Sequence, residues 1–391
     1  AKEYPHWRVR LLDVEAGGDW PIQEMFRLHY NAQGNALAYR DQEWFSQKLL
    51  HVRELPAQPT RYKTGGVYVV IGGAGGIGAV WSQWVMEKYQ AKVIWIGRRE
   101  KDSVIQEKLD AISKAGHTPI YIRADATNKK SLEKAYQQIK QTYSHINGVI
   151  HSAIVLLDSS LARMDEERFK DGLQAKVDVS VRMAEVFEKE SLDFVLFFSS
   201  MMAFGKAAGQ SNYAAGCVFK DAFARKFSHD WSCPVKVMNW GYWSSVGIVS
   251  DQSYKDRMEK AGIGSIDPEE GMEALEKLLN GPLDQVALIK NLKTDAMMNM
   301  GEIVLNEWMS CYPQALSTET MDRLENRLPE QGEKWKKITS DKKLQNPDIY
   351  CTKKNCCNLK KDNYNCCEKC YNNQLKDNER RKIKRLKIKK G

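Results

Sequence analysis

Hydrophobic residues gather in seven short runs through the middle of the chain, and longer polar–apolar segments separate these runs. In order they are VYVVI (67–71), KVIWIG (92–97), PIYIRAD (119–125), NGVIHSA (147–153), FVLFFSS (194–200), VKVMNW (235–240) and VALIK (286–290). Nearly continuous apolar runs are typical of strands buried on both faces, and the separating segments are long enough for crossover helices. The pattern predicts an α/β fold with a Rossmann-like doubly wound parallel sheet.

The first 60 residues follow a different pattern. HWRVRLLDVE predicts a strand, PIQEMFRLHYN a short helix, and NALAYRDQEWFSQKLL a pair of strands. A segment of this length is marginal as an independent domain, so we expect it to pack on the sheet or to be the remainder of a larger unit. We therefore predict a partial N-terminal subdomain (1–60), a main domain (61–315) and a linker with a tail (316–391).

The C-terminal tail is rich in Lys, Asn and Cys and lacks apolar periodicity, which predicts disorder. Residues 351–391 contain 14 Lys/Arg and 4 Asp/Glu, and the terminal RRKIKRLKIKK could bind polyanions, although a solvated run is favoured. Irregular spacing and few apolar neighbours argue against a zinc site, so we predict no metal. The tail holds six of the nine cysteines, namely Cys351, Cys356, Cys357, Cys366, Cys367 and Cys370.

The rest of the chain is electrically balanced, with 45 basic and 46 acidic residues. It gives no reason to expect a nucleic-acid partner. No apolar run reaches the roughly 18 residues of a membrane span, and the N-terminus shows no signal-peptide pattern, so we expect no membrane partner. Scattered Cys217, Cys233 and Cys311 favour a reducing, cytoplasmic compartment. The chain opens on Ala1, as expected of a processed protein or a piece of a longer one.

A glycine-rich stretch, GGAGGIG, follows the first of the seven runs. Gly73, Gly75 and Gly78 stand in G-x-G-x-x-G register between a predicted strand and a predicted helix, which favours dinucleotide binding over a turn that binds nothing. The second strand ends in IGRRE rather than in a carboxylate. Arg98, helped by Arg99, is suited to a 2′-phosphate, which favours NADP over NAD. Asp125 either bonds the adenine or caps the next segment.

Two hydroxyl groups are predicted to converge after the fifth run. Ser200 ends a central strand at the edge where open α/β sheets bind ligands, and Tyr213 begins the next helix. A serine hydroxyl can bond a developing oxyanion, and a tyrosine can supply the proton if an ammonium favours its phenolate. Lys176, on the preceding helix, is the candidate ammonium; the alternative is a solvated lysine.

Five motifs together resemble the short-chain dehydrogenase/reductase superfamily, and more closely the ketoreductase domains of modular polyketide synthases. They are GGAGGIG, HSA (151–153), FSS ending in Ser200, Q-x-N-Y with Tyr213, and N-W-G-x-W (239–243). Lys176 stands thirty-seven positions before Tyr213, as in that subfamily, and not four after it, as in free-standing reductases. The resemblance runs from about residue 66 to 292, and residues 1–60 look like the later part of a preceding structural subdomain.

The resemblance implies NADPH-dependent reduction of a 3-oxoacyl thioester, carried by an acyl carrier protein, to a 3-hydroxyacyl thioester. Other domains of a polyketide synthase module would be partners. Ser200, Tyr213 and Lys176 would be catalytic, and Asp158, Trp240 and Trp243 would lie on the substrate side and control stereochemistry. The residues that would hold NADPH are Gly73, Gly75, Gly76, Ile77, Gly78, Arg98, Asp125, Ala126, His151, Ser152 and Ala153.

Cys217 departs from the family pattern, which has asparagine four residues after the tyrosine. A thiol is a poor hydrogen-bond partner, which argues against a proton relay through this position, and simple helix packing is favoured.

Two alternative functions are weighed against the ketoreductase. A stand-alone 3-oxoacyl or carbonyl reductase is disfavoured because Cys217 occupies the place of the lysine in such enzymes. A non-catalytic NADP-binding domain is disfavoured because Ser200, Tyr213 and Lys176 are all present.

The loop after the fourth strand bears on stereochemistry. Subfamily members that give D-configured alcohols have L-D-D there, and this chain reads Leu156-Leu157-Asp158. The tryptophan typical of the opposite class is replaced by Gly205. The resemblance therefore implies a D-3-hydroxyacyl product. Residues 244–270, which include Gly247 and Met258, are expected to form a mobile lid over the acyl chain.

Overall fold

The computed structural model describes residues 2–29, 35–47, 49–54, 58–113, 118–205, 207–246, 252–293 and 303–310. The chain divides into two compact units, of which the larger spans Ala57–Met300 and the smaller contains Glu3–Pro56 and Gly301–Gly391. The predicted tail, 316–391, lies outside the described residues, as do Cys311 and Gly247.

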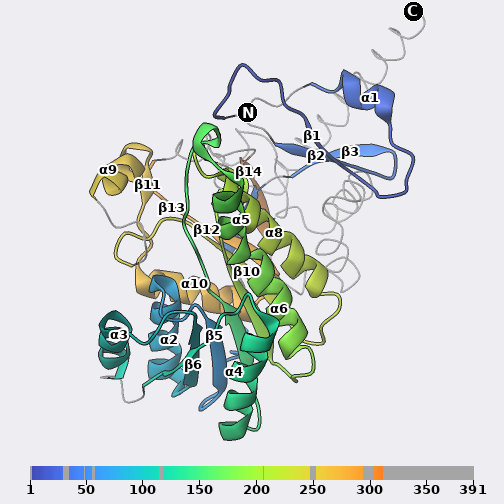
Figure 1. Ribbon diagram of the computed structural model, residues 1–391. Coiled ribbons are helices and arrows are strands. Elements are labelled where there is room, and N and C mark those ends of the chain that lie inside the picture. The colour runs from blue at the N-terminus through green and yellow to red at the C-terminus, as the bar shows by residue number, and fades with distance from the viewer. Residues whose placement is uncertain are drawn as a thin grey trace, which may run out of the picture. The chain divides into compact units, whose positions relative to one another are not determined.

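The larger unit alternates strands and helices (Figure 1). Its strands are β5 (Val67–Ile71), β6 (Lys92–Gly97), β7 (Ile120–Arg123), β8 (Gly148–His151), β9 (Phe194–Ser200), β10 (Val235–Trp240), β11 (Ile263–Gly264), β12 (Gln285–Leu288) and β13 (Lys290–Asn291). Its helices are α2 (Gly76–Tyr89), α3 (Ser103–Ser113), α4 (Lys129–Thr142), η1 (Leu161–Arg163), α5 (Glu166–Gln174), α6 (Val177–Phe187), α7 (Met202–Gly205), α8 (Ser211–Phe227), α9 (Gln252–Lys260) and α10 (Pro268–Asn280).

Seven of these strands form one sheet in the order β12-β10-β9-β8-β5-β6-β7. Every neighbouring pair is parallel. The chain runs outward from β5 through β6 to β7 and then returns to β8 on the other side of β5. This reversal makes the carboxyl ends of β5 and β8 the topological switch point, where open α/β sheets bind ligands. The predicted doubly wound parallel sheet is confirmed.

The core consists of two apolar layers, one on each face of the sheet. Alternate residues of β5 separate into them: Tyr68 and Val70 face one layer, and Val67, Val69 and Ile71 face the other. The first layer also holds buried residues of α2, α3 and α10, and the second holds those of α4, α6 and α8. Burial on both faces explains why the strands appear in the sequence as continuous apolar runs.

The smaller unit contains β1 (Leu11–Val14), α1 (Ile22–Arg27), β2 (Ala36–Arg40), β3 (Glu43–Ser46), β4 (Leu49–Glu54) and β14 (Ile303–Ser310). β1 pairs with β2 in parallel, and β2 with β3 in an antiparallel hairpin. The hairpin turn is Asp41–Gln42, and both residues have positive φ, as a type I′ turn requires. β4 pairs in parallel with β14.

Each helix in the described ranges is too short or too polar to cross a lipid bilayer.

Candidate active site

The glycine-rich loop joins β5 to α2 and packs tightly against β6 and the end of β8. Gly72 has a φ of +85°, which side-chain-bearing residues rarely adopt. A Cβ atom on Gly72 would lie 2.7 Å from the backbone nitrogen of Ala153, and one on Gly73 would lie 2.1 Å from Cδ1 of Trp95. Neither position leaves room for a side chain.

Helix α2 begins directly at this loop, with Gly75 as its N-cap. The next three residues, Gly76, Ile77 and Gly78, form its first turn, whose N–H groups lack partners within the helix and carry the positive end of its dipole. A Cβ atom on Gly78 would lie 3.1 Å from Oγ of Ser152, so the turn also adjoins the residue after β8. The loop thus fits the pyrophosphate group of a dinucleotide.

Arg98 follows β6 immediately, and its side chain is exposed at the same edge of the sheet. The neighbouring Arg99 forms an ion pair with Asp102 at 3.4 Å. Arg98 is therefore better placed than Arg99 to meet a phosphate group, and its role in cofactor selection stays a prediction.

Asp125 organises the turn between β7 and α4. Its Oδ1 accepts hydrogen bonds from the backbone N–H and the hydroxyl of Thr127, at 3.0 and 2.8 Å. The N-cap of α4 is a different residue, Asn128, and Ala126, within the turn, is buried. Asp125 thus shapes the turn without capping the helix, and its contact with an adenine ring stays a prediction.

Ser200 and Tyr213 meet at the carboxyl end of β9. Ser200 is the last residue of that strand, and Tyr213 lies in the first turn of α8. Burial raises the pKa of Tyr213 well above its usual value of 10.0, while a hydrogen bond with Ser200 acts in the opposite direction. The phenol therefore stays protonated at neutral pH, as a proton donor must.

Lys176 lies against the same tyrosine and is only 2% exposed, which excludes the solvated alternative. It occupies the N-cap of α6, at the junction with α5, rather than the interior of a helix. A Cβ atom on Gly216 would lie 2.8 Å from Cδ of Lys176, so this glycine makes room for the lysine beside α8.

The ammonium of Lys176 lies over the ring of Tyr213, 3.9 Å from its centroid. Burial lowers the pKa of this lysine. The sequence predicted that the ammonium would favour the phenolate of Tyr213. In the structure the desolvation of Tyr213 outweighs such an effect, and the net shift of its pKa is upward.

Cys217 lies one helical turn beyond Tyr213 and is fully buried. Its thiol forms a hydrogen bond with the phenol, and burial raises the pKa of the thiol. The residue therefore both packs in the helix interface and contacts the proposed proton donor.

Asp158, in the loop after β8, lies within electrostatic range of this cluster. Its negative charge raises the pKa of both Lys176 and Tyr213. Nε2 of Gln210 donates to Oδ2 of Asp158 at 2.6 Å, and Gln210 is the N-cap of α8. Asp158 is thus tied to the helix that carries Tyr213, and its control of stereochemistry stays a prediction.

His151 ends β8 and is completely buried, and the next residue, Ser152, donates its N–H to the carbonyl of Ile71 at 2.9 Å. Burial and the nearby Lys220 lower the pKa of His151 well below its usual range, so the imidazole is neutral. The HSA segment therefore borders the glycine loop at the topological switch point.

A second buried lysine, Lys220, was missed by sequence reasoning. It is fully buried on α8, and burial lowers its pKa to about 7. Its Nζ donates to the carbonyl of Phe198 at 3.0 Å and lies 3.3 Å from Nδ1 of His151. Helical spacing could have identified this lysine, because Lys220 lies seven residues after Tyr213 and three after Cys217, on the same face of a helix.

A polar network that sequence reasoning also missed holds the end of β9. Nδ2 of Asn239 donates to the carbonyl of Ser200 at 3.1 Å and to Oδ2 of Asp221 at 2.8 Å. Nε2 of Gln285 donates to the same Asp221 oxygen at 3.0 Å and to Oδ1 of Asn239 at 2.7 Å. The network fixes the backbone of Ser200 from the side of β10 and β12.

Trp240 and Trp243 lie in the hydrophobic core, 3% and 4% exposed. Their rings contact each other edge-to-face at 5.2 Å, and Trp240 contacts Phe198 in the same way at 5.6 Å. A Cβ atom on Gly271, in α10, would lie 2.5 Å from the Trp243 ring. Contact of either indole with a substrate stays a prediction.

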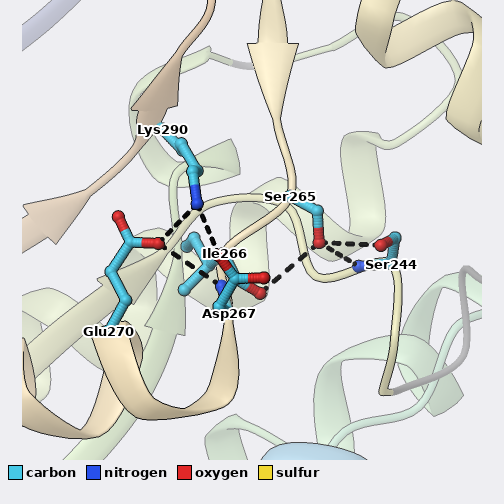
Figure 2. A network of polar contacts seen from close by, with 6 residues as sticks. All are labelled: Ser244, Ser265, Ile266, Asp267, Glu270 and Lys290. Atoms are coloured by element: carbon cyan, nitrogen blue, oxygen red, sulfur yellow. Dashed lines mark hydrogen bonds and ion pairs between the residues drawn. The ribbon is translucent and has the colours of Figure 1, made fainter.

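The two ends of the predicted lid are tied together (Figure 2). The hydroxyl of Ser244 donates to Oγ of Ser265 at 2.8 Å, and the N–H of Ser244 donates to the same oxygen at 2.9 Å. Beside this pair, Lys290 binds Asp267 at 2.6 Å and Glu270 at 2.8 Å, which anchors the start of α10. Met258 lies between these ends on α9 and is half-buried.

Comparison with known proteins gives a consistent result. Residues 66–245 match the family model of the KR domain. Two relatives from Bacillus subtilis (strain 168) are polyketide synthase PksM, 48% identical over 341 residues or 87% of this chain, and polyketide synthase PksN, 56% identical over 290 residues or 74% of this chain. This chain spans only 8% and 5% of the length of these relatives.

Among solved structures, a ketoreductase domain from the bacillaene assembly line matches with a TM-score of 0.66 and 21% sequence identity. The match covers 76% of this chain and 73% of that chain, and at this identity it bears on the fold alone.

Proposed function

Since residues 66–245 belong to the KR domain family of polyketide synthases, we propose that this chain reduces a 3-oxoacyl thioester to a 3-hydroxyacyl thioester with NADPH. The observation that carries the proposal is the meeting of Ser200, Tyr213 and Lys176 at the end of β9. The substrate would be bound to an acyl carrier protein, and other domains of the synthase would be the partners.

In this proposal, the Tyr213 phenol gives its proton to the oxygen of the ketone, and the Ser200 hydroxyl bonds the same oxygen as negative charge develops on it. Lys176 contributes a positive charge on the face of the tyrosine ring, which stabilises the phenolate left behind. NADPH, when bound, supplies the hydride.

The glycine loop and the first turn of α2 are proposed to hold the pyrophosphate of NADPH, Arg98 the 2′-phosphate, and Asp125 and Ala126 the adenine side. His151, Ser152 and Ala153 would line the nicotinamide. Cys217 and Cys233 are free thiols in this structure, and we place the reaction in the cytoplasm, where thiols stay reduced.

The direct test is to follow NADPH consumption by the protein with a short 3-oxoacyl thioester, with NADH as the cofactor control. Thioester-dependent oxidation of NADPH is the expected result. Tight NADPH binding without turnover would instead favour a non-catalytic NADP-binding domain, and absence of NADPH binding would contradict the assignment of the glycine loop.

Arg98→Ala is expected to raise the KM for NADPH about tenfold or more, because the variant loses a charge-assisted contact with a phosphate. The KM for NADH should stay unchanged. Steady-state kinetics with both cofactors provide the measurement. Arg182→Ala, which removes a surface arginine that pairs with Glu185, serves as the charge-matched control. Equal effects on the two cofactors would argue against a 2′-phosphate contact.

The product is expected to be the D-3-hydroxyacyl thioester. The support is Asp158 in the loop after β8, fixed by Gln210 beside the Tyr213 helix. Chromatography of the hydrolysed product on a chiral column, against both synthetic enantiomers, measures the outcome. A predominantly L product would show that Asp158 does not direct the substrate as proposed.

A further inference from the structure

Lys220 is a buried cation that the proposed chemistry does not use. It sits on the inner face of α8, and its side chain is fully buried. Burying an ammonium is costly unless hydrogen bonds compensate. Two acceptors face it: the Phe198 carbonyl on β9, at 3.0 Å, and Nδ1 of His151 on β8, at 3.3 Å.

These two contacts lie where the sheet opens onto the site. The pairing of β8 with β9 ends at His151 and Phe197, so Phe198 is the first residue of β9 beyond the ladder. Lys220 thus joins β8 and β9 to α8 at the point where β9 leaves β8 and continues toward Ser200 paired with β10. With Lys220 as donor, Nδ1 of His151 accepts, which assigns the ring hydrogen to Nε2.

The His151 contact leads toward the cofactor loop. The N–H of Ser152, the next residue, donates to the carbonyl of Ile71. A Cβ atom on Gly72 would lie 2.7 Å from the backbone nitrogen of Ala153, so the glycine loop lies directly against this segment. A shift of His151 would therefore move the backbone that borders the glycine loop.

We propose that Lys220 is a positioning residue of the reductase site, which holds His151 and the end of β9 and thereby sets the nicotinamide side of the cofactor site. The proposal rests on the proposed function only in that it requires NADPH as the cofactor. Lys220 acts through His151 and the backbone, and it forms no bond to the substrate.

The charge of Lys220 gives this role a pH signature. Charged and titratable groups face it from each neighbouring element: His151 on β8, Lys176 at the start of α6, and Cys217 and Asp221 on α8. Burial and the charge of Lys176 lower its pKa to about 7, against the smaller opposing effects of Cys217 and Asp221. Above that pH the neutral amine is a weaker donor, so NADPH affinity should fall as pH rises through about 7.

The matched pair of variants is Lys220→Met and Lys236→Met. Lys236 is also buried, 4% exposed, and donates to the carbonyls of Gly281 and Leu283 at 3.2 and 2.7 Å. It lies on β10 and contacts none of the proposed site residues through these bonds. A loss of general packing or of a buried lysine would affect both variants alike.

NADPH affinity is measured without substrate, by titration of nicotinamide fluorescence from about pH 6 to about pH 9. Lys220→Met should bind NADPH about tenfold more weakly than wild type and lose the inflection near neutral pH, whereas Lys236→Met should keep both. Equal affinities and equal pH profiles in the two variants would overturn the proposal. The titration needs no turnover. If the wild type binds NADPH but does not reduce the thioester, the proposed function is contradicted, and the role of Lys220 is still decided by the NADPH affinities of the two variants.

The pH dependence of unfolding tests the same residue without any cofactor. A lysine whose pKa is depressed in the folded state releases a proton on folding between about pH 7 and 10.5, so the unfolded state binds more protons and stability rises with pH in that window. Wild type and Lys236→Met should show this rise in full. A Lys220→Gln variant, which keeps a donor but no charge, should show a clearly smaller rise, to which Lys176, whose pKa burial also lowers, still contributes. A rise of the same size in Lys220→Gln would contradict the proposal, even if Lys220→Met does not fold.

Discussion

Tyr213→Phe is expected to reduce the rate of thioester reduction by about a thousandfold while leaving NADPH affinity nearly unchanged. General acid catalysis typically contributes about 10²- to 10⁴-fold to the rate of a reaction. Tyr213 is the proposed acid, and the ammonium of Lys176 lies over its ring. Its pKa is raised by burial, so the proton is in place at neutral pH. Phenylalanine keeps the ring and the contact with Lys176 but removes the proton.

The measurement is kcat with a 3-oxoacyl thioester beside a fluorescence titration of NADPH. Tyr136→Phe is the matched control, because its hydroxyl bonds Glu190 at 2.5 Å in the helix layer of α4. It should lower kcat less than about twofold, as expected for a surface-layer change. A Tyr213→Phe variant that retains most of its activity would remove Tyr213 from the role of acid.

Gly73→Ala is expected to destabilise the larger unit and to abolish measurable NADPH binding. The new Cβ atom would lie 2.1 Å from Cδ1 of Trp95. The indole has little freedom to move, since it is fully buried and its Nε1 donates to Oγ of Ser82 at 2.8 Å. Overpacking of this kind costs about 1 to 3 kcal/mol, and the loop must shift away from the cofactor to relieve it.

Chemical denaturation and NADPH titration measure the two effects. Gly205→Ala is the comparison, because a Cβ atom there would meet only Cε of Met202 at an ordinary 3.6 Å. It should leave the free energy of unfolding within about 0.5 kcal/mol of wild type. Unchanged stability and unchanged NADPH binding in Gly73→Ala would mean that the loop is looser than the structure indicates.

The strands could be predicted from the sequence because burial on both faces requires a continuous apolar run in each strand. The runs at 67–71, 92–97, 194–200 and 235–240 coincide with β5, β6, β9 and β10. The run at 119–125 is longer than β7, which ends at Arg123, because Asp125 bonds Thr127 and turns the chain. Side-chain bonds of this kind do not alter the apolar pattern.

The site could be predicted only as far as residue type and strand position determine it. Ser200 at the end of β9 and Tyr213 at the start of α8 follow from local pattern, and the structure brings them together. Lys220 could not be recognised in this way. Its proposed role depends on its contacts with Phe198 on β9 and His151 on β8. Helical periodicity shows that this lysine faces inward, but it does not show which residues of the sheet the lysine contacts.

The positions of Trp240 and Trp243 were unpredictable for a related reason. N-W-G-x-W lies at the carboxyl end of β10, the edge that binds ligands, yet both indoles turn into the apolar layer beneath α10. The close approach of Gly271 makes room for Trp243, and that glycine lies 28 positions further along the chain. Strand position alone does not reveal such a partner.

The most direct test of the proposed hydride transfer is to follow the hydrogen from NADPH to the product. The protein is incubated with a short 3-oxoacyl thioester and NADPH that carries deuterium at both C4 positions of the nicotinamide ring, and the product is analysed by mass spectrometry and NMR. We expect a 3-hydroxyacyl thioester with deuterium at C3 from wild type and none from Tyr213→Phe within the same time. A thioester recovered unchanged, or a hydroxyl product without deuterium at C3, would contradict the proposed hydride transfer.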